Sequence, residues 1–310
     1  MKLIYAGAPV FSITPLRALL DAGFCVCAVI TQPDKPAGRK AVMTPTPLKA
    51  YAAERGIPVY DFARIRDNVA NLRQIGADCM VTCAYGQILT QEVLQSFPMG
   101  VYNIHTSLLP RWRGASPVQH ALRAGDAKTG VTIMRTDAGL DTGDILLQEE
   151  TDITAQDTAE SLSERLSALG GECIVRALKQ VCEGCACFRK QPSEGVTLCK
   201  KIRKQECELD FARPAKELCC LIRAMNPEPL AFTTLHGKLV NLYSACVQCE
   251  RVSGECGEVV RADKTGIYVK AGEGVLQILE LQQEGGKRMR AADFVNGRKI
   301  VVGDRFGGQA

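Results

Sequence analysis

The feature that most constrains the fold is the alternation of short apolar runs with helical segments in the first half of the chain. Apolar runs of strand length lie at residues 3–7, 25–31 and 79–84, and segments of helical pattern lie at residues 13–22 and 47–55. Such alternation favours a parallel sheet with crossover helices. We therefore predict an α/β fold with an N-terminal doubly wound, mainly parallel sheet of the Rossmann-like kind.

The last hundred residues have a different pattern. After a helical segment near residues 214–224, short strands alternate with glycine-containing turns, at residues 231–235, 239–245, 257–261, 266–270 and 275–281. This pattern indicates a small C-terminal β-barrel, OB-like, of a kind that often binds nucleic acids. A chain of 310 residues can bury two cores. We predict a catalytic domain at 1–181, a basic linker at 182–206 and a β-barrel domain at 207–310.

Polar side chains follow one buried strand of the first domain. Because side chains alternate along a strand, Asn103 and His105 project to the same side of the run at residues 101–105. A later turn carries Asp141 and Asp144 among glycines and could return a carboxylate to the imidazole. An amide, an imidazole and a carboxylate together suit acyl transfer to an amine, since an amide can stabilise an oxyanion while histidine moves a proton. From the residues alone, a packed core histidine and a plain Asp-Thr-Gly-Asp turn remain open and are the more common interpretations of such residues.

Several stretches resemble the folate-dependent formyltransferases. The runs NIHTSLLPRWRGASPVQ, TGVTIM and GLDTGDIL carry the signature, and MKLIYAGAPVF, TQPDKPAGRK, AYGQIL and CLIRAMNPEP extend it over nearly the whole chain. The arginine and glycine pieces resemble the branch of the family that acts on methionyl-tRNA. The resemblance implies transfer of the formyl group of 10-formyltetrahydrofolate to the α-amino group of initiator methionyl-tRNA, in translation initiation.

The resemblance also implies which residues form the site. It carries Asn103, His105 and Asp141 over as the catalytic residues, and it favours Asp141 over Asp144 as the acid. The folate pocket would be lined by two segments, Tyr85, Gly86, Gln87, Ile88, Leu89 and Ser107, Leu108, Leu109, Pro110.

Basic residues in three places predict the tRNA contacts. The long loop at residues 32–45, rich in proline, glycine and cations, matches an insertion that engages tRNA in this family. The residues expected to bind nucleic acid are Arg39, Lys40, Arg111, Arg113, Lys201 and Lys204. Two alternatives stay open: the loop and linker charges are simply solvated, or Arg111 and Arg113 bind the glutamate tail of folate.

Composition bears on the compartment in which the protein works and on the state of its cysteines. The chain has 46% hydrophobic and 23% charged residues, and no apolar run approaches the length of a membrane span. We expect a cytoplasmic monomer with no membrane contact. The 15 cysteines are scattered, so we expect reduced thiols and no metal, although Cys182-x-x-Cys185 and Cys246-x-x-Cys249 have the spacing of zinc ligands.

Three rival functions are weaker. Another folate formyltransferase, acting on a glycinamide nucleotide or an amino sugar, would not need the basic loop or the second domain. An RNA-binding module that has lost catalysis would not need the intact trio. A nicotinamide-dependent oxidoreductase is disfavoured, because the turn after the first strand lacks the full glycine pattern.

Overall fold

The structure is a computed structural model that describes residues 1–38, 41–250 and 252–307. The chain divides into two compact units. The first contains Met1–Pro117, Lys128–Asp152 and Ser163–Lys200, and the second contains Val118–Ala127, Ile153–Leu162 and Lys201–Ala310. The finer domain boundaries expected from the sequence stay a prediction.

The first unit is built on one seven-stranded sheet with the strand order β10-β9-β7-β6-β1-β2-β5. The five strands from β7 to β5 in that order are mutually parallel, while β9 runs antiparallel to both β7 and β10. The strands are β1 (Lys2–Gly7), β2 (Cys25–Ile30), β5 (Val59–Tyr60), β6 (Cys79–Cys83), β7 (Val101–His105), β9 (Lys128–Arg135) and β10 (Ile145–Asp152). The prediction of a mainly parallel sheet is therefore confirmed.

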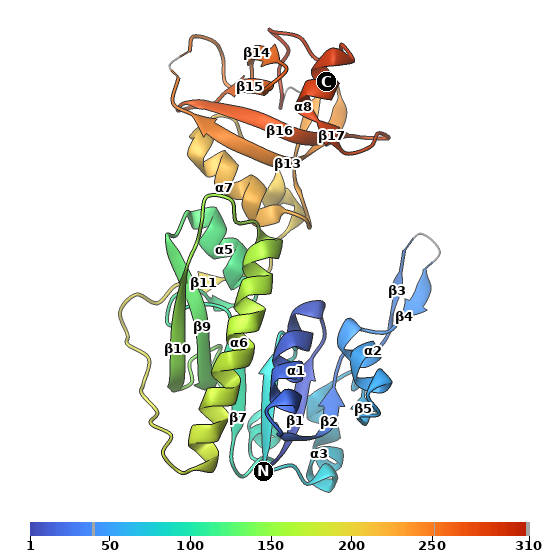
Figure 1. The fold of residues 1–310 in the computed structure, drawn as a ribbon, viewed down its shortest axis with the longest axis vertical. Coiled ribbons are helices and arrows are strands. Elements are labelled where there is room, and N and C mark those ends of the chain that lie inside the picture. Colours follow the sequence, from blue (N-terminus) through green and yellow to red (C-terminus); the bar gives the residue numbers. More distant parts are fainter. Residues whose placement is uncertain (39–40, 251, 308–310) are drawn as a thin grey trace. The chain divides into compact units, whose positions relative to one another are not determined.

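Helices cover both faces of this sheet (Figure 1). On one face, α6 approaches so closely that a side chain at Gly170 would meet Ile104 of β7, and one at Gly171 would meet α1. On the other face, Leu72 of α3 and Val93 of α4 pack with Ile4 of β1 in a single apolar cluster. The helices of this unit are α1 (Ile13–Asp21), α2 (Pro47–Glu54), α3 (Val69–Ile75), α4 (Gln91–Leu94) and all but the first turn of α6 (Ala159–Cys182), while α5 (Pro117–Ala124) falls in the second unit from Val118 on.

The segment that the sequence indicated as a plain loop contains a hairpin. Strand β3 (Lys35–Ala37) pairs antiparallel with β4 (Val42–Thr44) and projects from the sheet (Figure 1). Pairing satisfies backbone groups that a loop would leave to water, which explains why a proline-rich segment still forms strands. Arg39 and Lys40, predicted to bind tRNA, lie outside the described residues.

The second unit is an antiparallel sheet with the order β12-β13-β16-β15-β14, and β17 also pairs with β16. The segment near the C-terminus bridges both edge strands, since it accepts from Val259 N of β14 at Asp304 O, at 2.8 Å, and donates from Gly307 N to Thr234 O of β12, at 3.0 Å. The sheet therefore curls towards closure, as expected for a barrel-like domain. Its elements are α7 (Ala215–Met225), β12 (Ala231–Leu235), β13 (Lys238–Gln248), β14 (Val259–Asp263), β15 (Gly266–Lys270), β16 (Val275–Gln283), β17 (Met289–Arg290) and α8 (Ala291–Asn296).

Two further features complete the fold. A short parallel pair joins β8 (Arg113–Gly114) to β11 (Leu198–Cys199), so the segment that follows α6 returns to the loop after β7. Within the described ranges, no helix is long and apolar enough to cross a membrane.

Candidate active site

The site begins where β6 and β7 run side by side. Thr82 of β6 is paired with Asn103 of β7, and its hydroxyl donates to Asn103 Oδ1 at 2.9 Å. Because the amide oxygen is occupied, the amide nitrogen faces the opposite way, and Nδ2 donates to Asp141 Oδ1 at 3.4 Å. Thr82, which no sequence pattern singled out, therefore orients the amide of Asn103.

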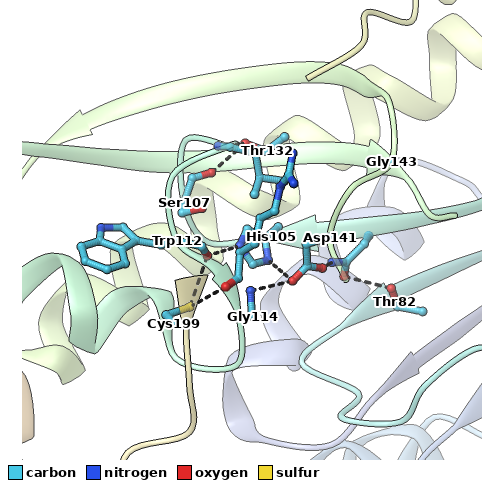
Figure 2. A network of polar contacts seen from close by, with 12 residues as sticks. Thr82, His105, Ser107, Trp112, Gly114, Thr132, Asp141, Gly143 and Cys199 are labelled. Atoms are coloured by element: carbon cyan, nitrogen blue, oxygen red, sulfur yellow. Dashed lines mark hydrogen bonds and ion pairs between the residues drawn. The ribbon is translucent and has the colours of Figure 1, made fainter. Parts of the chain in front are cut away.

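Asp141 arrives from a turn 38 residues beyond Asn103 in the chain. Its backbone has a φ of 52°, and its carboxylate Oδ2 accepts from the backbone N–H of Gly114 at 2.8 Å. The same oxygen lies 3.8 Å from His105 Nδ1, and the two side chains are only 15% and 6% exposed. The three predicted catalytic residues thus form one polar cluster, which Figure 2 shows around His105 and Asp141.

The contact made by Nε2 of His105 shows which ring nitrogen carries the proton. Nε2 lies 2.9 Å from the carbonyl oxygen of Trp112, and a carbonyl can only accept, so Nε2 carries a proton. In the neutral ring Nδ1 is then the basic nitrogen, and it faces the Asp141 carboxylate. This tautomer suits a group that takes up a proton at Nδ1.

The Trp112 carbonyl is held by more than His105. Trp112 has a φ of 62°, its N–H donates to Thr197 Oγ1 at 2.8 Å, and the Cys199 thiol donates to its carbonyl at 3.3 Å. Burial raises the pKa of the Cys199 thiol to about 11, so this group is a protonated donor near neutral pH. Figure 2 shows the sulfur beside this carbonyl.

Gly114 is required by its surroundings. Its φ is 121°, and a Cβ at this position would overlap the carbonyl oxygen of Cys199 on β11. The close approach of the two strands lets the Gly114 N–H reach Asp141.

The first predicted folate segment is an exposed loop with internal anchors. Gln32 Nε2 donates to Tyr85 O at 2.9 Å, and Gln87 accepts from Ile65 N at 2.7 Å. Tyr85 is buried in the apolar cluster that also contains Ile4 of β1 and Leu72 of α3. Gly86 is exposed, and Ile88 is 87% exposed. Leu89 is partly buried and packs against the same cluster.

The second predicted folate segment is held by hydrogen bonds to other parts of the protein. Ser107 is fully buried, its hydroxyl donates to Arg111 O at 2.6 Å, and its carbonyl accepts from Thr132 Oγ1 at 2.6 Å. Gln148 Nε2 donates to Leu109 O at 2.8 Å, while Leu108 and Pro110 are half-buried. The Ser107 hydroxyl and the Leu109 carbonyl are therefore already engaged by the protein itself.

A cavity of about 500 Å³ adjoins the Asp141 turn. Its lining includes Gly143 and Asp144 of that turn and Val101 of β7, all in segments that the sequence pointed to, whereas the α4 residues and Arg135 were not predicted. The one sequence signal for the cavity is that the predicted folate loop at residues 85–89 leads directly into α4, which forms part of the cavity wall. The lining residues are Gln91, Leu94, Gln95, Phe97, Pro98, Gly100, Val101, Arg135, Thr136, Asp137, Gly143 and Asp144.

The predicted cations lie in different surroundings. Arg111 lies over the ring of Trp112, with its guanidinium carbon 4.3 Å from the ring centroid. Arg113 donates through Nε and Nη2 to Gln191 Oε1, at 3.0 and 2.7 Å. Lys201 and Lys204 are exposed. Within the described residues, no group of three or more histidine, cysteine or acidic side chains is arranged to hold a metal ion.

Comparison with known proteins assigns the chain to a family. The formyl transferase family matches residues 5–178, and the formyl transferase C-terminal domain matches residues 201–299. A methionyl-tRNA formyltransferase of Chromobacterium violaceum is 46% identical over 310 residues, covering 99% of this chain and all of the relative. One from Coxiella burnetii is 41% identical over 307 residues, covering 98% of each chain.

Solved structures agree in fold. An N-formyltransferase from Helicobacter canadensis, in complex with folinic acid and dTDP-3-aminofucose, superposes with a TM-score of 0.68 at 19% identity over 90% of this chain and 99% of that one. HypX from Aquifex aeolicus gives a TM-score of 0.67 at 16% identity, with 97% of this chain matching 48% of the longer HypX chain. Identity along nearly the whole chain, together with both family matches, shows that this protein belongs to the methionyl-tRNA formyltransferase branch of the formyl transferase family.

Proposed function

We propose that this protein transfers the formyl group of 10-formyltetrahydrofolate to the α-amino group of initiator methionyl-tRNA, giving formylmethionyl-tRNA for translation initiation. The observation that carries the proposal is the cluster of Asn103, His105 and Asp141 in a chain that is 46% identical to a methionyl-tRNA formyltransferase. An amide, an imidazole and a carboxylate in contact are the groups that direct acyl transfer to an amine requires.

In the proposed reaction the amine nitrogen of methionine attacks the formyl carbon. The carbonyl oxygen becomes an oxyanion in the tetrahedral intermediate, and Asn103 Nδ2 is the amide donor suited to stabilise it. Thr82 fixes the amide in this orientation before substrate binds, so no reorganisation is needed during the reaction. The bond from the formyl carbon to N10 of the folate then breaks, and tetrahydrofolate leaves.

The attacking amine must lose a proton and folate N10 must gain one. His105 Nδ1 is the ring nitrogen that can take up this proton and return it to the leaving nitrogen, through a water molecule. The imidazolium formed in between faces the Asp141 carboxylate at 3.8 Å, in a nearly buried setting where opposite charges attract strongly. Asp141 therefore stabilises the charged form and keeps the ring in place.

The cavity beside the Asp141 turn suits the bicyclic ring of the folate. Its volume of about 500 Å³ lies in the range of small-molecule sites, and its lining mixes apolar residues such as Leu94 and Val101 with polar and charged ones such as Gln91 and Arg135. The loop at residues 85–89 leads into α4, one wall of this cavity, which supports a role for that loop at the rim. Asn103, His105 and Asp141 are not among its lining residues, so the cavity adjoins the catalytic cluster only through Gly143 and Asp144 of the turn.

The acceptor is a tRNA, so cations should meet its phosphates. Arg39, Lys40, Arg111, Lys201 and Lys204 are the candidates, and Arg113 divides its donors between Gln191 and any ligand. We further propose that the protein acts as a monomer in the cytoplasm, where translation takes place.

Formyl transfer measured with purified protein tests the function. Initiator methionyl-tRNA, elongator methionyl-tRNA and a glycinamide nucleotide are offered side by side with 10-formyltetrahydrofolate. We expect preferential formylation of the initiator tRNA, and an Asn103→Ala variant at least a hundredfold slower, as for loss of an oxyanion donor. Formylation of the nucleotide alone, or of none of the three acceptors, would refute the proposal.

A further inference from the structure

The turn that carries Asp141 is closed at its base by the hydrogen bond from Arg135 N to Asp144 O at 2.9 Å, but the residues at its tip are exposed. Asp137 Oδ1 accepts from Gly139 N at 3.1 Å and from Thr142 Oγ1 at 2.7 Å, but both Asp137 and Thr142 are exposed. Asp141 itself has a φ of 52°, in the left-handed region that non-glycine residues rarely adopt. A residue in this conformation stays in place only when its surroundings over-determine it.

Gln191 supplies the missing constraint. Its Nε2 donates to two carbonyl oxygens of the turn, those of Asp141 and Gly143, both at 2.8 Å. Its Oε1 accepts from Nε and Nη2 of Arg113 at 3.0 and 2.7 Å. The amide thus uses both of its hydrogens and both acceptor positions, and a reversed amide would set its oxygen against two carbonyls.

Two neighbouring residues of β8, Arg113 and Gly114, both connect to Asp141. Gln191 links the Asp141 backbone to Arg113, and the next residue of β8, Gly114, donates its N–H to the Asp141 carboxylate at 2.8 Å. Strand β8 is fixed in turn by its pairing with β11 and by the flanking hydrogen bond from Arg113 N to Thr197 O at 2.9 Å. Asp141 is therefore held at its backbone and at its carboxylate by neighbouring residues of a single short strand.

We propose that Gln191 is a positioning residue for the formyl transfer reaction: through Arg113 it fixes the turn that presents the Asp141 carboxylate to His105 and Asn103. This inference rests on the proposed function. Gln191 lies 50 residues beyond Asp141 in sequence, in the stretch after α6, and touches none of the three catalytic side chains through a bond that would make it a chemical participant.

Two substitutions test the role of the amide. Gln191→Met removes both donors and the acceptor, whereas Gln191→Glu keeps an acceptor for Arg113 and replaces the donor to the turn with a carboxylate oxygen that faces the Asp141 and Gly143 carbonyls. We expect kcat to fall ten- to a hundredfold in both, because a displacement of about 1 Å in a catalytic group can cost a hundredfold. The KM for methionyl-tRNA should change less than threefold, since Asp141 acts in the chemical step.

Gln282→Met is the matched control. Gln282 also donates its side-chain amide to a turn carbonyl, that of Gly286 at 3.0 Å, but in the second unit. We expect its kcat to stay within twofold of the wild type. Thermal unfolding of each variant shows whether it is folded, and should Gln191→Met fail to fold, the nearly isosteric Gln191→Glu decides.

A double variant distinguishes a positioning role of Gln191 from a general structural effect of its substitution. In an Asp141→Asn protein the group to be positioned has lost its charge, so adding Gln191→Met should lower kcat by less than a further twofold. A purely structural role would multiply the two losses and overturn the proposal, as would a Gln191→Glu enzyme with wild-type kcat. An inactive wild type in the same assay would instead refute the proposed function.

Discussion

Replacing Asp141 with asparagine removes the negative charge from the catalytic cluster. The substitution preserves shape and leaves an oxygen to accept the Gly114 N–H, now 2.8 Å from the carboxylate, but it replaces the oxygen that accepts from Asn103 Nδ2 at 3.4 Å with an amide nitrogen. It removes the negative charge that lies 3.8 Å from His105 Nδ1, between side chains 15% and 6% exposed. The expected effect is therefore on the step in which the imidazole becomes charged, and stability should change little.

The magnitude follows from Coulomb's law. Two unit charges about 4 Å apart attract by about 4 kcal/mol at an effective dielectric constant of about 20. Since each ~1.4 kcal/mol of barrier is a factor of ten in rate, full loss of this attraction would slow the reaction about a thousandfold. The retained hydrogen bond offsets part of the loss, so we expect kcat to fall between about a hundredfold and a thousandfold.

The assay is single-turnover formylation at saturating folate and methionyl-tRNA, which reports the chemical step alone. Asp67→Asn provides the control, because Asp67 Oδ1 lies at the same 3.8 Å from the cation of Arg66 but both side chains are more than half exposed. An exposed pair of this kind contributes little, so this variant should match the wild type. If Asp141→Asn kept its rate within threefold, the charge would have no part in the reaction as proposed.

Three further outcomes follow from the packing. Gly114→Ala should destabilise the protein by at least ~1–3 kcal/mol in urea unfolding, because its Cβ would overlap the Cys199 carbonyl at a φ of 121°; an unchanged midpoint would contradict this. Thr82→Val should lower kcat several-fold while the fold is kept, because the Asn103 amide loses the donor that orients it; a wild-type rate would show that the hydroxyl is dispensable. Alkylation of the native protein near pH 8, read by mass spectrometry, should label exposed thiols first and spare buried ones until unfolding, since burial raises the pKa of the Cys79 and Cys83 thiols to about 12. The exposed set is Cys25, Cys182, Cys185, Cys187 and Cys249, and the buried set is Cys79, Cys83, Cys173, Cys199, Cys207 and Cys220. Early labelling of the second set would show that these thiols are accessible in the folded protein.

The sequence by itself determined the features that depend on neighbouring residues. The alternation of apolar and helical segments predicted the mainly parallel sheet, and the run at residues 101–105 is indeed the strand β7. Period-two alternation put Asn103 and His105 on one side of that strand, because this follows from strand geometry alone. The resemblance predicted the family, which the comparisons confirm. The assignment of individual catalytic, folate and tRNA residues stays a prediction.

Tertiary structure decided what distant segments contribute to the site. Thr82 comes from β6, and Gln191 and Cys199 come from the segment after α6; each acts through one side chain on a strand or turn remote in sequence. No periodicity marks such residues, since their positions depend on how the sheet and the returning segment after α6 close in space. The same holds for the cavity beside Gly143 and for the left-handed backbone of Asp141, which long-range hydrogen bonds sustain. Local sequence sets which elements form, and only their packing determines which side chains meet.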